Sequence, residues 1–473
     1  MSGVLEVEHV ETGRWRSAVA AAIDGGAEFD GLYAAPTGHD PAVRLVLRQG
    51  AARRMLTARA AESRLATVVD LLPAAEWDER EAHDTHGVVF DGHEPLRALV
   101  AHPADRAGWI TPVEGPDVHE VAVGPIHAGV IESGHFRFHV VGERVLHLDL
   151  RLFYKHRGLE RAAEGVTLAG GLAVARRACA ACAAANAVAY AQAVESLLGL
   201  EPDEDLRRSR TAILELERLY NHLHDLSALC AGVGFDPGTM TFAALKERAQ
   251  RVNERVTGHR FLFGAVRIGE GAGDVDAGTA AEVRREIEAI GSDAAAAWRT
   301  LTFMEAVQDR LRGVGPLSRE DAERWGAVGP VARASGVHRD ARTENPGLLW
   351  YPDLLPARPE HPTGDVAARA EVRALELEQT CAMLSGLLGA PPGPGQATAS
   401  REPAALGVAC VESPRGATVC CVEADEDHIV RLHLRTASYA NWPVLARVVP
   451  GAILPDFPLI NKSFELCYAC VDR

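Results

Sequence analysis

The sequence carries little positive charge for its size and contains no long apolar run. Lysine and arginine together number 49, against 65 aspartates and glutamates, which gives a formal net charge of −16. This balance argues against nucleic acid or an anionic lipid surface as the main partner. The longest uncharged stretch without proline, residues 178–194, is mostly alanine and includes Asn186 and Gln192, so it is too weakly apolar to span a bilayer. Any membrane association must therefore be made through other subunits.

The cysteines do not form the pattern of a disulfide framework. There are nine in 473 residues, an odd number, and Glu6, Glu8 and Glu11 stand where the apolar core of a signal peptide would lie. We therefore expect a reducing, cytoplasmic setting in which the thiols stay free. With 47% hydrophobic and 24% charged residues and no low-complexity tract, the composition is that of an ordinary folded protein.

The length and patterning predict an α+β protein of two or three domains. Residues 1–105 alternate β-branched and helical stretches, as in a small N-terminal α/β domain, and residues 106–118 are rich in proline, glycine and aspartate, as in a linker. A β-hairpin is predicted next, with strands at 134–141 and 145–150. The remainder predicts a large helix-bundle core, with helices near 243–263, 280–311 and 365–389, and C-terminal strands at 407–411, 417–422 and 429–434.

Four cysteines form two C-x-x-C pairs, Cys179 with Cys182 and Cys467 with Cys470. Two cysteines three residues apart can direct both sulfurs at one metal ion, and two such pairs supply the four soft thiolates that suit zinc, nickel or an iron centre. The pairs stand much further apart than those of a zinc finger or ribbon. From this pattern alone, inert buried thiols and a structural zinc site stay open beside a redox metal.

Six blocks, in order along the chain, resemble the large subunit of energy-converting NiFe hydrogenases of the formate hydrogenlyase type. They are 124–125 (GP), 132–138 (ESGHFRF), 156–160 (HRGLE), 177–182 (RACAAC), 412–416 (ESPRG) and 456–473 (DFPLINKSFELCYACVDR). Further pieces at 217–218, 221–222, 253–255 and 329–336 also fit the homologous catalytic-core (D-type) subunit of complex I. Residues 77–81 (WDERE) and 86–93 (HGVVFDGH) resemble the C-type subunit of complex I. The resemblance implies a domain like that C-type subunit at 1–105 and a hydrogenase large-subunit domain at 119–473.

The resemblance also implies the cofactor, a NiFe(CO)(CN)2 centre. By position, Cys179 and Cys467 would be terminal nickel ligands, and Cys182 and Cys470 would bridge nickel to iron. Thiolates are soft donors that stabilise nickel through its redox changes, and a terminal thiolate can also accept a proton. Cys467 is expected to take the proton released when H2 is split heterolytically.

Further site residues follow by position in the family's motifs. Arg415 matches the arginine beside the open metal position, where its charge can polarise H2, and Pro414 next to it is expected to contact the cofactor. Glu132 resembles the proton-relay glutamate, with an offset of one residue because Ser133 directly precedes the Gly-His step. Glu160 falls on the glutamate that binds a magnesium ion, which makes Mg a second candidate cofactor.

Several positions depart from the family. Alanines replace the usual isoleucine and glycine around Cys179, and Asn186 replaces a histidine one helical turn after Cys182. Asn186 can donate a hydrogen bond to the bridging sulfur but cannot titrate. Glu465 and Leu466 replace Asp-Pro, and Arg473 replaces a terminal histidine. A diverged paralogue with slow or no H2 chemistry therefore stays open. The sequence ends three residues after Cys470, so either maturation involves no cleavage of a C-terminal extension or the sequence is the mature form.

The resemblance implies the catalytic large subunit of a membrane-associated NiFe hydrogenase that makes or consumes H2. Its expected partners are an iron–sulfur small subunit that resembles the B-type subunit of complex I and carries a 4Fe-4S cluster, a ferredoxin-like electron-transfer subunit, and membrane subunits resembling proton or ion pumps. No nucleic acid partner is expected. The expected location is the inner face of the cytoplasmic membrane, reached through those partners.

Two other functions stay open. One is a complex I-like subunit that lines a quinone site and binds no nickel. That subunit lacks the cysteine pairs and uses a histidine and a tyrosine at the quinone site. His127 and His135 are imperfect candidates for this histidine. The other is a non-catalytic scaffold with structural zinc. The metal content of the purified protein separates all three.

Overall fold

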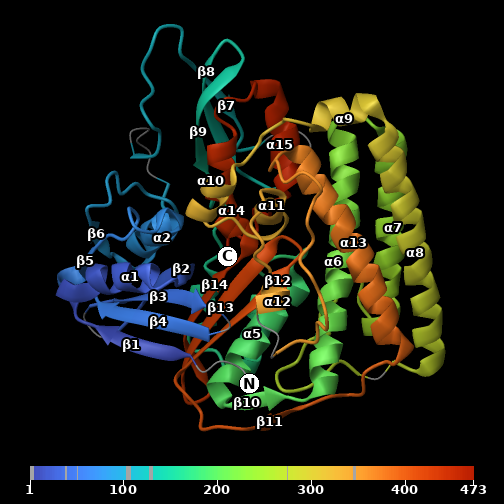
Figure 1. Cartoon of the computed structure of the whole chain (residues 1–473). Helices are drawn as coiled ribbons and strands as arrows, with labels where there is room; N and C mark the ends of the chain where they lie inside the picture. The colour runs from blue at the N-terminus through green and yellow to red at the C-terminus, as the bar shows by residue number, and fades with distance from the viewer. Residues whose placement is uncertain are drawn as a thin grey trace.

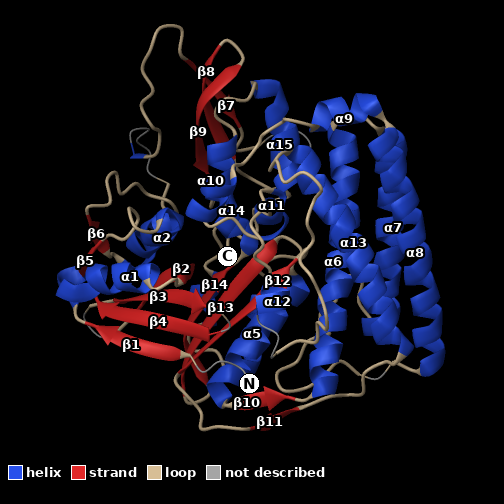
Figure 2. Cartoon of the chain, in the orientation of Figure 1, coloured by secondary structure: helices blue, strands red, loops and turns tan. Residues whose placement is uncertain are grey.

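The computed structural model describes residues 5–37, 40–50, 52–102, 108–126, 132–273, 275–344 and 348–473. It confirms the predicted α+β architecture: a small N-terminal sheet domain, a helical core and C-terminal strands that lie between them (Figures 1 and 2). None of the helices in these ranges combines the length and the apolar character needed to cross a bilayer.

The N-terminal sheet buries both faces of three of its four strands. It consists of β1 (Glu6–Val10), β2 (Glu28–Ala35), β3 (Ala42–Gln49) and β4 (Ala52–Arg59), in the order β1-β4-β3-β2, with β1 parallel to β4 and the other pairs antiparallel. Along β3, Leu45 and Leu47 pack with α1 (Trp15–Asp24), whereas Val46 packs with Val408 of the C-terminal sheet. Because side chains alternate between the faces of a strand, this continuous apolar run suits a sheet covered on both sides.

The predicted hairpin is confirmed and carries a third strand. The three-stranded antiparallel sheet is formed by β7 (His119–Val123), β8 (His135–Val141) and β9 (Arg144–Arg151). Gly142 makes the turn between β8 and β9 with φ 59, a backbone conformation that glycine adopts without strain. In the expected linker, residues 106 and 107 lie outside the described residues.

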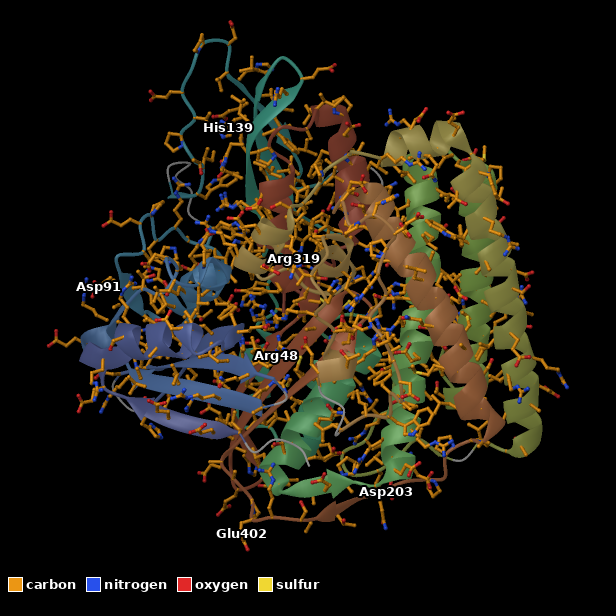
Figure 3. All side chains as sticks on the ribbon, in the orientation of Figure 1. Arg48, Asp91, His139, Asp203, Arg319 and Glu402 are labelled. Atoms are coloured by element: carbon orange, nitrogen blue, oxygen red, sulfur yellow. The ribbon has the colours of Figure 1, made fainter. Side chains whose placement is uncertain are left out.

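Four long helices pack side by side as a bundle at the right of Figure 1: α6 (Glu204–Gly232), α7 (Asp236–Thr257), α8 (Ala277–Phe303) and α13 (Val366–Gly389). Three of them begin at an aspartate that accepts a backbone N–H of the first turn, namely Asp203, Asp276 and Asp365. Figure 3 places Asp203 at the lower end of α6. The helix expected at 280–311 is interrupted, because Met304 has an extended backbone (φ −86, ψ 95) between α8 and α9 (Glu305–Leu311).

The C-terminal sheet is an antiparallel meander of β12 (Leu406–Ser413), β13 (Gly416–Asp425) and β14 (His428–Arg435), close to the predicted strands. The alanine-rich helix α5 (Ala183–Leu198) packs across β12 and β13, and its small side chains allow the close approach: a Cβ on Gly407 would lie 1.9 Å from the Ala193 oxygen. The sheet thus separates the N-terminal domain from the helix bundle.

Short elements complete the chain. The helices are α2 (Glu76–His86), α3 (Leu159–Ala163), α4 (Leu168–Ala175), α10 (Arg319–Arg324), α11 (Gly329–Ala334), α12 (Ala341–Glu344), α14 (Ala437–Val448) and α15 (Phe457–Phe464). The strands β5 (Arg64–Ala66) and β6 (Val89–Asp91) pair in parallel, and β10 (Leu200–Pro202) and β11 (Ala397–Ala399) pair antiparallel.

Candidate metal centre

The two cysteine pairs lie where helices start or stop. Cys179 lies in the turn after α4, and Cys182 is the residue immediately before α5. Cys467 and Cys470 follow α15, whose end is closed by Glu465 in the left-handed conformation (φ 51). Both pairs are therefore presented by short irregular segments that packed helices hold in place.

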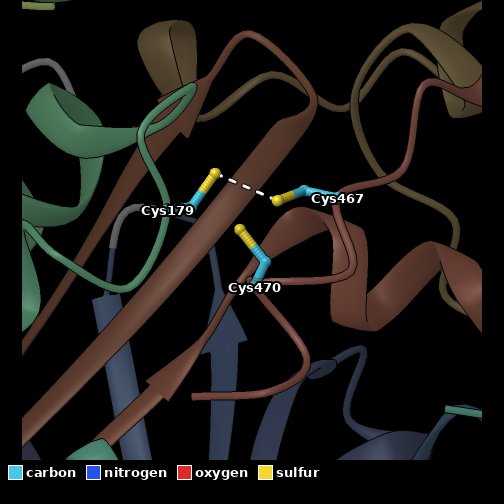
Figure 4. A group of neighbouring side chains, drawn as sticks. All are labelled: Cys179, Cys467 and Cys470. Carbon is cyan, nitrogen blue, oxygen red and sulfur yellow. Dashed lines mark hydrogen bonds between the residues drawn. The ribbon is translucent and has the colours of Figure 1, made fainter. Parts of the chain in front are cut away.

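The sulfurs converge although the pairs are far apart in the sequence. Cys179 Sγ lies 3.1 Å from Cys467 Sγ across a separation of 288 residues. The sulfurs of Cys179, Cys467 and Cys470 all lie within 4.8 Å of one another (Figure 4). Cys182 packs into the same cluster and, like Cys179, is only 3% exposed. Buried thiols this close form the donor set for a soft metal ion or a small metal cluster.

The acidities of the four thiols are coupled. Hydrogen bonds from Cys182, Cys467 and Cys470, together with the positive charge of Arg415, lower the pKa of Cys179. The pKa of each of the other three is raised, first because each shares its proton with Cys179 and second because it is buried. Because thiolates are the metal-binding form, a metal ion that binds all four sulfurs must displace the protons that they carry.

Arg415 is buried and held on several sides. Its Nε donates to the backbone carbonyl oxygen of Glu465 at 2.6 Å, and its Nη1 donates to Asn221 Oδ1 at 2.7 Å. Its Nη2 lies 3.5 Å from Asp225 Oδ1. Although burial opposes the charge, Asp225 and Cys182 raise the pKa of Arg415 above its ordinary value. The protein therefore keeps a fixed positive charge beside the cysteine cluster.

Close backbone packing fixes the turn that carries Arg415. Pro414 and Arg415 are its two central residues, between the paired Ser413 and Gly416. Ser413 Oγ donates to the Gly416 oxygen at 2.8 Å. Gly329, the first residue of α11, has φ +68, and a Cβ there would lie 2.2 Å from the Arg415 oxygen. Because only glycine fits, α11 can press directly on the turn.

A row of polar side chains on α6 holds the first cysteine loop, and the sequence reasoning gave these residues no role. Glu217 accepts the backbone N–H groups of Ala184 and Ala185 in the first turn of α5, at 2.7 and 2.9 Å, and burial raises its pKa to about 8. Asn221 donates to the Ala181 oxygen at 2.8 Å while its own oxygen accepts from Arg415. The available signal was the recurrence of Glu217, Asn221 and Asp225 every four residues, which places them on one helix face.

Arg157 joins the two cysteine loops, and it too was missed as a site residue. Its Nη2 donates to the Ala178 oxygen at 2.6 Å and to the Ala469 oxygen at 2.7 Å. Its backbone nitrogen donates to the Asp472 oxygen at 2.8 Å. A rigid guanidinium with several donors can bridge carbonyls from separate segments. This contact spans 312 residues, so local sequence gave no sign of it.

Glu132 lies at the second cysteine loop. Its Oε2 accepts the backbone N–H of Tyr468 at 2.8 Å and that of Ala469 at 3.1 Å. Burial, and then the neighbouring Cys179, raise its pKa above the ordinary value. Nearby, a Cβ on Gly134 would lie 2.5 Å from the Tyr468 ring, so glycine permits this close packing. The Glu132 carboxyl is therefore fixed to the backbone of the loop that carries Cys467 and Cys470.

Asn186 carries a buried amide one helical turn after Cys182. Its backbone N–H donates to the Cys182 oxygen at 3.0 Å, which places it one turn into α5. The side chain is fully buried, and within the described residues neither its Nδ2 nor its Oδ1 has a hydrogen-bond partner. An unpartnered buried polar group costs about 1–3 kcal/mol. A polar group on a bound metal would satisfy this amide, so the donor set and its surroundings fit such a centre.

Glu160 does not fit a magnesium ion. Its Oε1 accepts from Arg473 Nε and from the Leu434 N–H, each at 2.8 Å, and its Oε2 accepts from Arg431 Nη2 at 3.1 Å. Magnesium requires near-octahedral coordination by oxygen, usually with several waters. Here N–H donors approach both carboxylate oxygens, and the positive charge comes from two arginines.

The two histidines considered for a quinone site have different outcomes. His127 lies outside the described residues. His135 packs edge-on against Trp109, with 5.2 Å between the ring centroids, and burial lowers its pKa. It makes none of the contacts that hold the cysteine loops.

Two protein-family models match the chain. Residues 233–401 and 396–473 match the respiratory-chain NADH dehydrogenase 49 Kd subunit, and residues 18–113 match the 30 Kd subunit of the same enzyme. The two matches lie in one chain, in the order that the resemblance of the short motifs implied.

Individual relatives include hydrogenase and complex I proteins. Formate hydrogenlyase subunit 5 of Escherichia coli (strain K12) is 32% identical over 440 residues, which is 86% of this chain and 76% of that protein. The carbon monoxide-induced hydrogenase of Rhodospirillum rubrum is 30% identical and is covered over 99% of its length, with 75% of this chain. The C/D 2 subunit of the NADH-quinone oxidoreductase of Aquifex aeolicus (strain VF5) is 31% identical, over 68% of this chain and 63% of that protein.

A solved structure shows the same fold. It is a chain of the membrane-bound sulfane sulfur reductase, an archaeal respiratory membrane complex. The TM-score is 0.70 at 28% sequence identity, and the match covers 77% of this chain and 100% of that one.

Proposed function

We propose that this chain, which belongs to the family of the respiratory-chain NADH dehydrogenase 49 Kd subunit, is the catalytic large subunit of a membrane-associated NiFe hydrogenase. A region that matches the 30 Kd subunit of the same enzyme precedes it in the chain. Its reaction is the formation or oxidation of H2, with electrons exchanged with iron–sulfur clusters of another subunit. The relatives that are 30–32% identical to this chain include both hydrogenases and complex I subunits. The choice between a hydrogenase and a complex I function therefore depends on the cysteine site.

The convergence of the four thiols carries the proposal. A quinone-site subunit of the complex I type has no use for two C-x-x-C pairs, whereas a nickel centre needs four soft donors at one point. Cys179 Sγ and Cys467 Sγ lie 3.1 Å apart, and the cluster is buried rather than lying at a surface loop. Three buried thiols and the partly exposed Cys467, beside the fixed charge of Arg415, suit a reactive site better than a structural zinc site.

We assign the cofactor as NiFe(CO)(CN)2. Cys179 and Cys467 would be its terminal nickel ligands, and Cys182 and Cys470 would bridge to iron. When bound, the group supplies the redox chemistry and Lewis acidity that H2 cleavage requires. The unpartnered amide of Asn186 and the turn residue Pro414 would contact its polar ligands.

The chain's own residues provide charge and proton handling. Arg415 holds a fixed guanidinium beside the sulfurs, where it can stabilise developing negative charge without reorganisation. Cys467, the most exposed residue of the four, would hold the proton at its Sγ. Glu132 accepts two backbone N–H groups of the same loop, so its carboxyl can take that proton onward.

The partners follow from the chemistry of the site. Electrons require an iron–sulfur small subunit with a 4Fe-4S cluster near the centre, and a ferredoxin-like subunit beyond it. The chain contains no described helix that could cross a bilayer, so membrane ion-pump-like subunits would attach it to the inner face of the cytoplasmic membrane.

Metal analysis and infrared spectroscopy of the complex purified with its co-expressed partners test the proposal. Stoichiometric nickel together with the stretching bands of carbon monoxide and cyanide is the expected result. Cys470→Ser should remove both, whereas Cys381→Ser, a buried cysteine outside the cluster, should leave both unchanged. Zinc, or no metal, in matured wild-type complex would overturn the proposal in favour of a scaffold or a quinone-linked subunit.

A further inference from the structure

The carboxylate of Glu160 is enclosed by donors from distant parts of the chain. Arg473 Nε and the Leu434 N–H reach Oε1, and Arg431 Nη2 reaches Oε2. His433 Nδ1 lies 3.5 Å from Oε1. Although burial opposes ionisation, Arg473, His433 and Arg431 hold the pKa of Glu160 well below its ordinary value. The group is therefore an ionised carboxylate that already has its counter-charges.

Arg473 reaches two carboxylates from two different domains. Its Nε donates to Glu160 Oε1, and its Nη2 donates to Glu81 Oε1 at 3.0 Å and to Glu81 Oε2 at 2.9 Å. Glu81 lies on α2 of the N-terminal domain, whereas Glu160 is on α3 beside the C-terminal sheet. The guanidinium also lies 4.5 Å over the Tyr439 ring, and the residue is 2% exposed. The planar fork of an arginine suits this arrangement better than a lysine would.

The positive charge that faces Glu160 comes from side chains. Arg473 pairs with Glu160 and Glu81, and Arg431 pairs with Glu160 and lies 3.8 Å from Glu164. A buried carboxylate is stable only when paired and hydrogen-bonded, and both conditions are met here by side chains. A magnesium ion at Glu160 would have to displace N–H donors that already occupy both of its carboxylate oxygens.

We propose that Arg473 is the built-in cation of this site and a positioning residue for the metal centre. Its guanidinium takes the role that a divalent ion would have at Glu160, and it ties the segment carrying Cys470 to both domains at once. Arg473 lies three residues from Cys470, and its neighbour Asp472 accepts from Arg157, which bridges the two cysteine loops. The N-terminal domain thereby contributes to the geometry of the cysteine cluster through Glu81.

The expected effect of Arg473 on nickel rests on the proposed function, whereas its effect on magnesium binding and its coupling to Glu81 do not. Magnesium binding is tested first. Complex dialysed against EDTA is expected to contain no stoichiometric magnesium while keeping its thermal unfolding temperature. One magnesium per chain that survives dialysis and disappears in Glu160→Gln would overturn the proposal.

The contact between Arg473 and Glu81 is tested by the unfolding temperatures of single and double variants. Arg473→Gln and Glu81→Gln should each lower the unfolding temperature of the purified complex, and the double variant should lose little more than Arg473→Gln alone, because both remove one contact. Fully additive losses would overturn the link between the domains. Arg319→Gln, which removes an exposed ion pair with Glu323, is the matched control and should change the temperature little (Figure 3).

The readout at the centre is spectroscopic. Arg473→Gln should reduce nickel content severalfold or shift the carbon monoxide and cyanide bands of the metal that remains, and Arg473→Lys, which keeps the charge, should restore part of the effect. Unchanged nickel and unchanged bands in Arg473→Gln would reduce Arg473 to a structural role. If wild-type complex contains no nickel, the proposed function fails, while the magnesium and coupling results still decide the role of Arg473.

Discussion

Asn221 connects Arg415 to the first cysteine loop through a single side chain. Its oxygen accepts from Arg415 Nη1 at 2.7 Å, and its nitrogen donates to the Ala181 oxygen at 2.8 Å. The amide group serves as an acceptor through its oxygen and as a donor through its nitrogen. The guanidinium is thereby fixed relative to Cys179 and Cys182, which flank Ala181, rather than only relative to its own turn.

Removing this connection should slow turnover without removing the metal. In Asn221→Ala, Arg415 loses a hydrogen bond that involves a charged group, which is worth about 1.5–3 kcal/mol, so activity should fall roughly 10- to 100-fold. Asn221→Gln keeps both an amide oxygen for Arg415 and an amide nitrogen for Ala181, so its defect should be smaller. H2 evolution per nickel measures both. Equal activity of Asn221→Ala and wild type would show that Arg415 is held without Asn221.

Arg415→Lys should keep nickel and lower turnover strongly. A lysine can keep the positive charge near Asp225, but it cannot donate at once to Glu465 and Asn221 as the guanidinium does. Loss of one fixed electrostatic donor at a reacting centre typically costs about 100-fold or more in turnover. Nickel content and H2 evolution of the purified complex are the measurements. A lysine variant with full activity would mean that charge alone suffices.

Local sequence predicted most of the elements and singled out the cysteines that the fold brings together, because these signals are short-range. The hairpin appeared in two apolar runs around Gly142, and the pairs containing Cys179 and Cys467 were selected by their spacing. The helix near 280–311 was predicted as continuous because periodicity does not register the extended backbone of Met304. A single residue of extended backbone ends a helix without changing the hydrophobic pattern around it.

The parts that sequence could not reach are contacts between distant segments. Glu160 was matched to a magnesium site by its position in the family's motif, whereas its pairing with Arg473, 313 residues away, is visible only in three dimensions. Arg157 was noted only as part of a motif, and its bridge between the cysteine loops depends on how those loops fold. Glu217 did carry a local signal, the four-residue polar spacing on α6, but that spacing does not say which helix it caps.

Cys470→Ser should abolish both nickel binding and H2 activity. Cys470 is fully buried, and its sulfur lies within 4.8 Å of those of Cys179 and Cys467, so a serine hydroxyl would leave three thiols and a hard oxygen donor at the centre. Metal analysis and H2 assays on the same preparation measure the loss. Nickel at the wild-type level with full activity in this variant would contradict the ligand assignment.

Glu412 should make stability depend on pH near neutrality. Its carboxylate accepts from Arg333 Nη1 at 2.8 Å and from the Ala341 N–H at 3.0 Å, yet burial and then Asp340 raise its pKa to about 7. In the unfolded chain its ordinary value is 4.5. Between these values the native state holds more protons than the unfolded state, so the stability contributed by Glu412 falls as pH rises through this window.

Glu412→Gln removes that titration, so the variant should gain stability relative to wild type as pH rises from about 5 to about 8, by an amount on the order of 1–3 kcal/mol. The measurement is the difference in unfolding temperature between the two complexes at each pH, in which the titration of the shared cysteine cluster cancels. Glu376 offers a matched control, because it pairs with the same Arg333 at 2.7 Å but its pKa, despite burial, is held well below the ordinary value by Arg333. Glu376 stays ionised across this range, so Glu376→Gln removes no titration of its own, and its difference from wild type should change less with pH than that of Glu412→Gln. A constant difference for Glu412→Gln as well would mean that Arg333 keeps both carboxylates ionised at neutral pH.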